Sequence, residues 1–445
     1  MDRTFDVAIV GAGFAGIAAA VALAKAGRRV LLVEARAALG GRAATLTDRV
    51  TGEPIDNGQH VLFGCYRETL ALIAELGMAD ALLVQPSLRV PFVGPDGVRR
   101  DLQCADVPAP FNLASGLLRW RALAVGERAR AARLALSLIR SAGRAEPGAH
   151  ETVTAWLDRL GQTPRLREWL WDPLAVAALN QDPAEAAASM FAPVLRELFT
   201  GGRRSASIVL PRVPLSQLYA EPACTYIEAR GGQVRTGRPA RVNVDGAGFA
   251  LRAGDNRWHV RSLVVAVPWH QFATVFEDAP PAALVPACDA ARSMRSIPIV
   301  TVNLWFDRPI LDGELFVGLI GRTAQWVFDR RAVTGESASH VSVTTSAAAR
   351  LAVRDDDAIV GAVAGDLKAA LPGARDARVT RATVVREKQA TFAVPPGAPP
   401  RPDTRTPLPR LLLAGDWLAT GLPGTIEGAV RSGHRAAYEL LRQGL

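Results

Sequence analysis

Two short and almost continuous apolar runs open the chain, with a helical stretch between them. The first run is FDVAIV at residues 5–10, and the second is RRVLLVE at residues 28–34. Apolar runs of this length that do not alternate with polar residues are typical of strands buried on both faces. The pattern therefore predicts a parallel strand–helix–strand unit at the start of the chain.

The period of the pattern changes several times farther along. An Ala/Leu/Arg-rich region from Pro108 to Arg144 predicts amphipathic helix, whereas between Arg204 and Trp269 the period shortens toward two and predicts a second sheet layer. Further strands are predicted at residues 262–269, 296–309, 339–346 and 411–417, helices at residues 356–371 and from about 425 onward, and a proline-rich connection at residues 395–409.

Composition indicates a globular protein with more than one core. The chain has 445 residues, of which 49% are hydrophobic and 21% charged, and this excludes a disordered or fibrous protein. Because a domain usually holds roughly 100–200 residues, we expect two or three lobes. No apolar stretch reaches the roughly 20 uninterrupted residues that a spanning helix needs.

The cysteines and the N-terminus favour the cytoplasm. Cys65, Cys104, Cys224 and Cys288 lie far apart without paired spacing, which predicts neither a disulfide framework nor a metal site. The first apolar run leads directly into a glycine motif, unlike a signal peptide. We therefore expect a reducing, cytoplasmic environment.

The chain carries an excess of positive charge, which comes almost entirely from arginine. The formal net charge is +9, and only three of the 52 basic residues are lysines. No helix-turn-helix, zinc-finger or aromatic RNA-binding pattern accompanies this charge, so no nucleic acid partner is expected. An anionic membrane surface is the better candidate partner.

The first chemical motif lies between the first predicted strand and helix. It reads Gly11-Ala12-Gly13-Phe14-Ala15-Gly16, and Glu34 ends the second strand. The glycines permit a tight turn, close approach of a pyrophosphate and close helix packing, the helix N-terminus faces the anion, and Glu34 would bind ribose hydroxyls. This motif predicts a dinucleotide site and fits NAD as well as FAD.

A second glycine pair favours FAD. Glu34 and Ala35 lead into Gly40, Gly41 and Arg42. This arrangement resembles the superfamily of FAD-dependent amine oxidases and phytoene desaturases, in which the glycine pair and the arginine extend the dinucleotide site toward the flavin. The resemblance implies that these five residues belong to the FAD site.

Two more segments match the superfamily. The segment IDNGQHVLFGCY at residues 55–66 would pass beside the flavin ring, with Gly58 close to the ring and Gln59 or His60 facing its reactive side. In the strand ARVNV, Val242 would meet the adenine through its backbone.

The C-terminal part of the chain supplies the second flavin motif of the superfamily. Gly415 and Asp416 would bind the ribityl or pyrophosphate portion of FAD. A helix that begins at Gly424, Thr425 and Ile426 would direct its positive end at the flavin and stabilise negative charge on the reduced ring.

Residues 108–113 and 171–199 resemble the squalene-associated branch of the superfamily. That resemblance implies that reduced FAD replaces the allylic hydroxyl of hydroxysqualene with hydride, in bacterial squalene and hopanoid synthesis. The terminal motif holds no cysteine and the strand at residues 297–305 holds no lysine, two features that amine oxidases of the superfamily often use. We therefore expect noncovalent FAD, an isoprenoid substrate and an electron donor of unknown identity.

Candidate catalytic residues come from the ring segment. His60 is the first choice as the acid or as the group that orients the hydroxyl, and Gln59 lies beside it. Aromatic walls would favour an allylic cation. The candidate substrate-lining residues are Trp171, Asn180, Phe191, Trp305 and Trp326.

Two other classes of protein remain open. One is a carotenoid-type desaturase, or another FAD-dependent lipid oxidoreductase, acting on a similar polyene. The other is a flavin-free isoprenoid carrier, which would be expected to lack the terminal flavin motif that this chain has at residues 415–430.

The expected fold class is α/β, with an α+β second lobe. A Rossmann-like FAD-binding domain would combine residues 1–85, 205–280 and 409–445. A discontinuous substrate domain of mixed sheet and helices would combine residues 86–204, expected to be largely helical, with residues 281–408, expected to hold sheet and helix. Residues 108–144 are the candidate membrane contact, on the inner face of the membrane.

Overall fold

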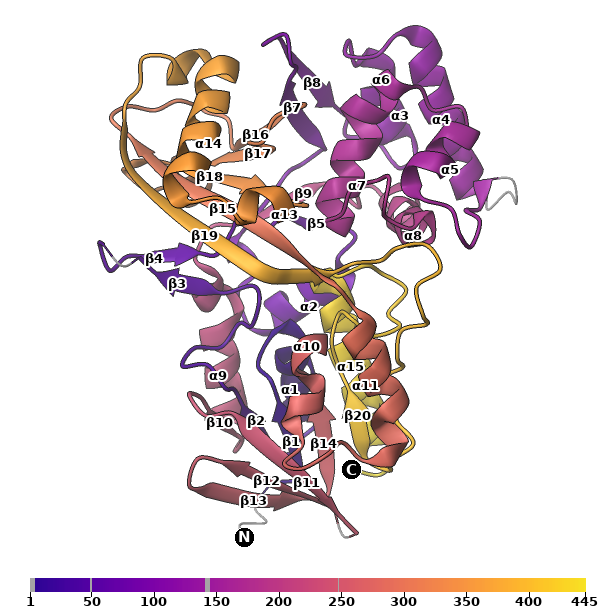
Figure 1. The fold of residues 1–445 in the computed structure, drawn as a ribbon, viewed down its shortest axis with the longest axis vertical. Coiled ribbons are helices and arrows are strands. Elements are labelled where there is room, and N and C mark those ends of the chain that lie inside the picture. The colour runs from indigo at the N-terminus through magenta and orange to yellow at the C-terminus, as the bar shows by residue number, and fades with distance from the viewer. Residues whose placement is uncertain (1–4, 49, 141–144, 247) are drawn as a thin grey trace.

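The computed structural model describes residues 5–48, 50–140, 145–246 and 248–445. Figure 1 shows a lobe that holds both chain ends and, beyond it, a second lobe with a large twisted sheet and a group of helices. The long strand β19 crosses between them. The last four residues of the candidate membrane contact, 141–144, lie outside the described residues.

A parallel sheet of five strands forms the centre of the first lobe. Its order is β10-β2-β1-β14-β20, and every neighbouring pair is parallel. The strands are β1 (Val7–Val10), β2 (Val30–Val33), β10 (Gln233–Arg235), β14 (Ser262–Val265) and β20 (Leu411–Leu413). The predicted parallel unit at the start of the chain is therefore confirmed, and strands from the middle and the end of the chain complete its sheet.

Both faces of this sheet are covered. Helices pack on one face, and a three-stranded antiparallel sheet with two further helices packs on the other. The helices are α1 (Phe14–Lys25), α2 (Arg67–Glu75), α9 (Glu221–Glu228) and α15 (Ile426–Arg442). The covering sheet comprises β11 (Ala240–Asp245), β12 (Gly248–Ala253) and β13 (Asn256–Val260), beside α10 (Trp269–Phe272) and α11 (Val285–Ser293).

The second lobe is built on a seven-stranded sheet. Its order is β19-β15-β18-β17-β16-β7-β8, and only β16 and β7 pair in parallel. The strands are β7 (Arg89–Val93), β8 (Arg99–Gln103), β15 (Ser296–Phe306), β16 (Phe316–Leu319), β17 (Trp326–Asp329), β18 (Ser339–Thr345) and β19 (Val379–Phe392). The hairpin β7–β8 comes from the segment that we expected to be largely helical.

Helices cover this sheet as well. The helix α14 (Asp356–Ala370) packs its buried Ile359, Val363 and Leu367 against one face. The other helices of the lobe are α3 (Phe111–Arg119), α4 (Val125–Ile139), α5 (Val153–Arg159), α6 (Pro164–Leu166), α7 (Asp172–Leu179), α8 (Ala188–Thr200), α12 (Arg330–Thr334) and α13 (Ala349–Ala352). Within the described ranges, none of the helices is both long and apolar enough to span a bilayer.

Short strands connect the two lobes. An antiparallel group joins β5 (Leu62–Phe63), β6 (Leu82–Val84) and β9 (Ile208–Pro211), and β3 (Thr45–Thr47) pairs with β4 (Pro54–Asp56). The sequence pattern did not predict β3, β4, β5 or β6, because strands of two or three residues leave too little periodicity to detect. The strand β9 lies within residues 204–269, which were predicted to form sheet, whereas α9 is a helix in that same region.

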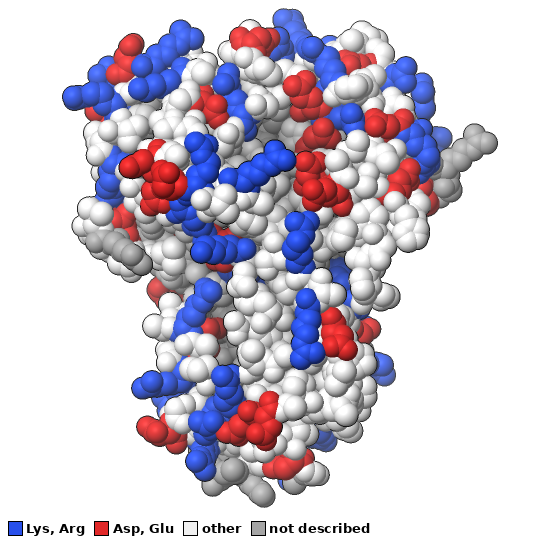
Figure 2. Space-filling view, viewed as in Figure 1, with Lys and Arg blue, Asp and Glu red and all other residues white. Residues whose placement is uncertain are grey.

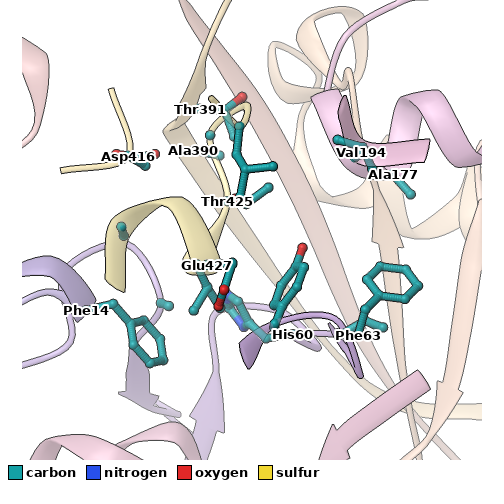
Figure 3. Close-up of a pocket in the computed structure, with 18 of the residues that line it drawn as sticks. Phe14, His60, Phe63, Ala177, Val194, Ala390, Thr391, Asp416, Thr425 and Glu427 are labelled. Carbon is teal, nitrogen blue, oxygen red and sulfur yellow. The ribbon is translucent and has the colours of Figure 1, made fainter. Parts of the chain in front are cut away.

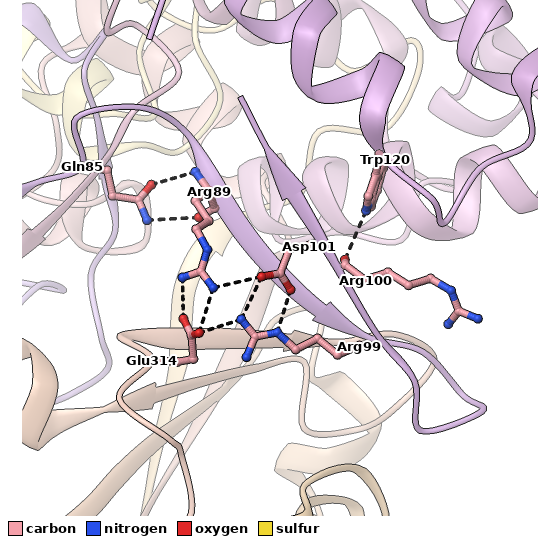
Figure 4. Close-up of polar contacts among 7 residues, drawn as sticks. All are labelled: Gln85, Arg89, Arg99, Arg100, Asp101, Trp120 and Glu314. Atoms are coloured by element: carbon pink, nitrogen blue, oxygen red, sulfur yellow. Dashed lines mark hydrogen bonds and ion pairs between the residues drawn. The ribbon is translucent and has the colours of Figure 1, made fainter. Parts of the chain in front are cut away.

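A cluster of charges fixes the hairpin β7–β8 to the rest of its sheet (Figure 4). Arg89 Nη1 lies 2.6 Å from Glu314 Oε2, and Arg99 Nη2 lies 2.6 Å from Glu314 Oε1. Both arginines also contact Asp101. The hydrogen bond from Arg89 lowers the pKa of Glu314, so this carboxylate stays charged and continues to hold the edge of the sheet.

The tightest helix contact of the first lobe lies between α1 and α15, and it generates a stability prediction. A Cβ added at Gly433 would lie 2.2 Å from the carbonyl oxygen of Ala15. We expect Gly433→Ala to lower the free energy of unfolding by about 1–3 kcal/mol, as overpacking does. Thermal melting of the holoprotein measures the effect.

The matched control is Gly361→Ala. Gly361 lies in α14, and a Cβ there would meet nothing within 4 Å. Because alanine favours helix over glycine, this variant should melt at the same temperature as the wild type or slightly higher. Equal melting temperatures for Gly433→Ala and the wild type would contradict the packing argument.

Candidate active site

One continuous cavity of about 970 Å³ runs from the parallel sheet to the helices of the second lobe. At one end it is lined by the glycine turn after β1 and by the start of α15. At the other end it is lined by apolar residues of α3, α4, α7 and α8. Figure 3 shows Phe14 and Asp416 on one side of this space, and Phe63, Ala177 and Val194 on the other.

The glycine turn leaves room for a ligand where side chains would otherwise stand. Gly11 has φ +103°, and a Cβ there would lie 2.6 Å from the carbonyl oxygen of Ala266. A Cβ at Gly16 would lie 1.8 Å from the carbonyl oxygen of Gly11, so this glycine lets α1 approach the strand. Gly13 caps α1 without a side-chain hydrogen bond, so the N-terminus of the helix remains open to an anion.

The carboxylate of Glu34 is held at the end of β2 by backbone donors. The amide of Ala12 donates to Oε2 at 2.8 Å, and the amide of Arg36 donates to Oε1 at 2.9 Å. Each carboxylate oxygen can accept a further hydrogen bond. Glu34 and Ala35 both line the cavity, in the position that ribose hydroxyls of a dinucleotide would require.

Arg42 joins the N-terminal and C-terminal motifs. Its guanidinium pairs with both carboxylate oxygens of Asp416, with Nη2 to Oδ1 at 2.5 Å and Nη1 to Oδ2 at 3.0 Å. Nη1 also donates to the carbonyl of Ala390, in the part of β19 where the register with β15 shifts. Gly40 and Gly41 line the cavity beside this pair.

The start of α15 faces the same space. Thr425 caps the helix, and its hydroxyl accepts a hydrogen bond from the amide of Gly428. A Cβ at Gly424 would lie 3.3 Å from Asp416 Oδ2. Gly415, Asp416, Gly424, Thr425 and Ile426 all line the cavity. A helix N-terminus in this position stabilises a nearby negative charge.

The ring segment, residues 55–66, places polar side chains at the cavity wall, among them Gln59 and His60. A Cβ at Gly58 would come 2.9 Å from Thr301 Oγ1, so the backbone there lies close to β15. Arg330 Nη1 donates to Gln59 Oε1 at 2.8 Å. Arg330 thereby fixes the orientation of the Gln59 amide, whose nitrogen can donate to a ligand.

His60 is a neutral imidazole in this setting. Its Nδ1 lies 2.8 Å from the carbonyl oxygen of Gly58, and a carbonyl only accepts, so Nδ1 carries the hydrogen and Nε2 is an acceptor. Burial lowers the pKa of His60, partly offset by the charge of Asp56. Figure 3 shows His60 between the residues labelled on the two sides of the cavity.

The structure does not place Val242 at the cavity. Val242 is only 1% exposed, and its carbonyl accepts a hydrogen bond from the amide of Glu277. Ala240 and Arg241, which precede it in β11, line the cavity instead. The expected contact between the backbone of Val242 and an adenine stays a prediction. Apart from Gly16, which packs α1 as expected, the other predicted cofactor residues line the one cavity.

Only two of the five predicted substrate-lining residues lie on the wall. Trp171 and Trp326 line the cavity. Asn180 instead joins three segments, because its amide donates to the Ile297 carbonyl and to Thr391 Oγ1 while its oxygen accepts from the Ala347 amide. This corrects the expected polar contact.

Phe191 and Trp305 also lie away from the cavity. Phe191 is fully buried against Trp156 in the helical core. Trp305 is stacked between His340 and the guanidinium of Arg381. Periodicity could show that these aromatic residues are buried, but it could not distinguish burial in a core from exposure to a cavity.

Several wall residues were missed by the sequence analysis. These residues are Phe63, Tyr66, Glu197, Ile299, Glu427 and Arg431. Phe63 and Tyr66 lie in the ring segment and Glu427 lies in the C-terminal motif, so these three had a signal in the sequence. Ile299 is the residue that β15 contributes to the wall, and no lysine is among the described residues that line it.

Comparison with known proteins agrees with this geometry. The family described as flavin containing amine oxidoreductase matches residues 14–441. A hydroxysqualene dehydroxylase of Sinorhizobium fredii is 31% identical over 97% of each chain, and a 15-cis-phytoene desaturase of Synechococcus elongatus is 26% identical over 98% of this chain and 95% of its own. Cyclohexylamine oxidase of Brevibacterium oxydans has the same fold, with a TM-score of 0.72, 20% identity and 99% of each chain covered.

The chain therefore belongs to the flavin containing amine oxidoreductase family. It is an FAD-dependent oxidoreductase of that family, and its similarity to hydroxysqualene dehydroxylase extends over almost its whole length.

Proposed function

We propose that this protein replaces the allylic hydroxyl of hydroxysqualene with hydride, giving squalene and water. The observation that carries the proposal is the single cavity, in which the dinucleotide cradle opens directly into an apolar space. The 31% identity with a hydroxysqualene dehydroxylase supports the same substrate. Reduced FAD, when bound, supplies the hydride.

FAD would be held without a covalent bond. The glycine turn would receive the pyrophosphate, Glu34 would accept from the ribose hydroxyls, and the N-terminus of α15 would face the flavin ring. Asp416, fixed by Arg42, would orient the remaining part of the cofactor. Neither thiol on the wall, Cys65 or Cys104, belongs to the C-terminal motif.

His60 and Gln59 would orient the hydroxyl of the substrate. With Nδ1 bound to Gly58, His60 offers the Nε2 lone pair, which accepts a hydrogen bond from the hydroxyl. Gln59 offers its amide N–H groups to the hydroxyl oxygen, because Arg330 fixes its other end. We therefore assign His60 the orienting role, since a neutral imidazole that donates its only proton to Gly58 has none for the substrate.

The walls would protect an allylic cation. Trp171 and Trp326 present aromatic surface to the cavity, and such faces attract a cation. Most of the remaining wall toward α7 and α8 is apolar, so water that could capture the cation is excluded. The desaturase alternative would use the same cavity in the oxidising direction, and product analysis separates the two.

The lipid would enter from a membrane surface through α3 and α4. The cavity reaches Phe111, Leu117 and Leu136 of these helices. Phe111 is 69% exposed, and Leu118 of the same helix is 68% exposed. Exposed arginines surround them, and Figure 2 shows basic side chains at the outer edge of the molecule over α4. This combination suits anionic headgroups, so we place the protein on the inner face of the membrane.

An anaerobic single turnover tests the reaction. Chemically reduced holoenzyme is mixed with hydroxysqualene, flavin reoxidation is followed by absorbance, and the lipid is extracted. We expect squalene to form in step with reoxidation, one per flavin. Recovery of intact hydroxysqualene with flavin still reduced would refute the proposal and favour a desaturase.

The role of His60 is tested by His60→Ala in the same assay. We expect turnover to fall roughly 10- to 100-fold, because the hydroxyl loses its orientation, while the absorbance of bound FAD is retained. His259→Ala changes a histidine of β13 that does not line the cavity, and it should match the wild type. Unchanged turnover in His60→Ala would rule out the orienting role.

Membrane capture is tested by flotation with anionic liposomes. Replacing both Phe111 and Leu118 with serine removes the exposed apolar side chains of α3 and should reduce the bound fraction roughly tenfold. Val353→Ser is the control, since Val353 is 85% exposed but lies beside α13. Equal flotation of the double variant and the control would exclude this surface as the anchor.

A further inference from the structure

One polar group on the cavity wall has no partner in the fold. Tyr66 lines the cavity, and its phenol makes no hydrogen bond with any residue that the structure describes. The other two buried or half-buried tyrosines are satisfied, since Tyr219 donates to the carbonyls of Gly40 and Ala43 and Tyr226 donates to Glu75. The hydroxyl of Tyr66 is therefore available to a molecule in the cavity.

The position of Tyr66 is fixed by its surroundings. Its backbone amide donates to the carbonyl of Phe63 at 2.9 Å, and its ring meets the Phe63 ring edge to face with centroids 5.8 Å apart. Tyr66 is also the N-cap of α2, whose first amides donate to the carboxylate of Glu427. A phenol held in this way needs little reorganisation to act on a substrate.

The carboxylates near Tyr66 are engaged by other groups of the fold. Glu427 accepts from the amides of Glu68 and Thr69 and from the Thr69 hydroxyl, and it pairs with Arg431 at 3.1 Å. Glu197 pairs with the same arginine at 2.9 Å. Both carboxylates therefore hold the fold together around α2 and α15, whereas the phenol of Tyr66 does not.

Tyr66 itself remains a phenol at neutral pH. Burial raises its pKa, and the nearby Cys65 and Glu427 raise it further because a second negative charge beside them is unfavourable. The thiol of Cys65 is also protonated, with a pKa raised to about 12, but it is packed in an apolar cluster with Leu198 and Ala206 and is only 4% exposed.

We propose that Tyr66 is the general acid that protonates the departing hydroxyl. The proposal rests on the proposed function. The allylic C–O bond breaks with its electron pair on oxygen, the phenolic proton moves to that oxygen, and water leaves. Reduced FAD, when bound, would supply the hydride that the carbon takes up, and the Tyr66 oxygen would regain a proton from the solvent. Overall, the reaction consumes one alcohol, one hydride and one proton and gives squalene and water.

The three polar residues have different roles because they offer different hydrogen-bonding groups. His60 accepts from the hydroxyl and Gln59 donates to its oxygen, and both fix its position, whereas Tyr66 supplies the proton as the bond breaks. Without a proton the leaving group would be hydroxide, which is a poor one in an apolar space. A positioned general acid contributes typically about 10²–10⁴-fold to a rate.

The test is Tyr66→Phe, which keeps the ring and removes only the hydroxyl. In the anaerobic single turnover with hydroxysqualene, we expect squalene formation at least about 100-fold slower than in the wild type. The FAD content by absorbance, and the binding of squalene by quenching of tryptophan fluorescence, should equal the wild-type values. Tyr438→Phe changes an exposed tyrosine of α15 and is the control.

A second substrate separates acid catalysis from a structural effect. In the allylic chloride analogue the leaving group needs no proton, so Tyr66→Phe and the wild type should convert it to squalene at rates within about threefold. A variant as slow on the chloride as on the alcohol, or as fast as the wild type on the alcohol, would overturn the role of Tyr66. A wild-type enzyme that forms no squalene from either compound would instead overturn the proposed function.

Discussion

The ion pair between Arg42 and Asp416 joins parts of the chain that are 374 residues apart in sequence. The side chain of Asp416 is only 6% exposed, so removing Arg42 would leave a buried carboxylate without its ion-pair partner. The same contact brings the glycine turn, the glycine pair and the start of α15 around one space. Neither end of the chain makes the cofactor cradle without the other.

Short sequence patterns predicted the cofactor part of the site, because that part is formed by residues that are adjacent in the sequence. The turn at Gly11, the acid at Glu34 and the helix start at Thr425 each depend on a few adjacent residues, so the sequence alone placed them on the correct elements. The cavity wall depends on packing between distant segments. Phe191 and Trp305 are aromatic and buried, but they pack in hydrophobic cores away from the cavity.

The cavity changes in character along its length. Near the glycine turn it presents backbone amides and charged side chains, and toward α7 and α8 its wall is mostly apolar, including Ala177 and Val194. The ring segment contributes the polar groups of Gln59, His60 and Tyr66 to the same wall. A lipid with a single hydroxyl has a similar distribution of polarity, which is why we propose that its hydroxyl lies beside these polar groups.

The strand order has a consequence for synthesis of the protein on the ribosome. The parallel sheet is completed by β20 at Leu411–Leu413, and the hairpin β7–β8 finds its partner β16 more than two hundred residues later in the chain. Both sheets therefore depend on contacts between distant segments, which form slowly. The ribosome makes the glycine turn first and the start of α15 last, and both line the cofactor site. A nascent chain therefore cannot bind its cofactor until almost the whole protein has been synthesised.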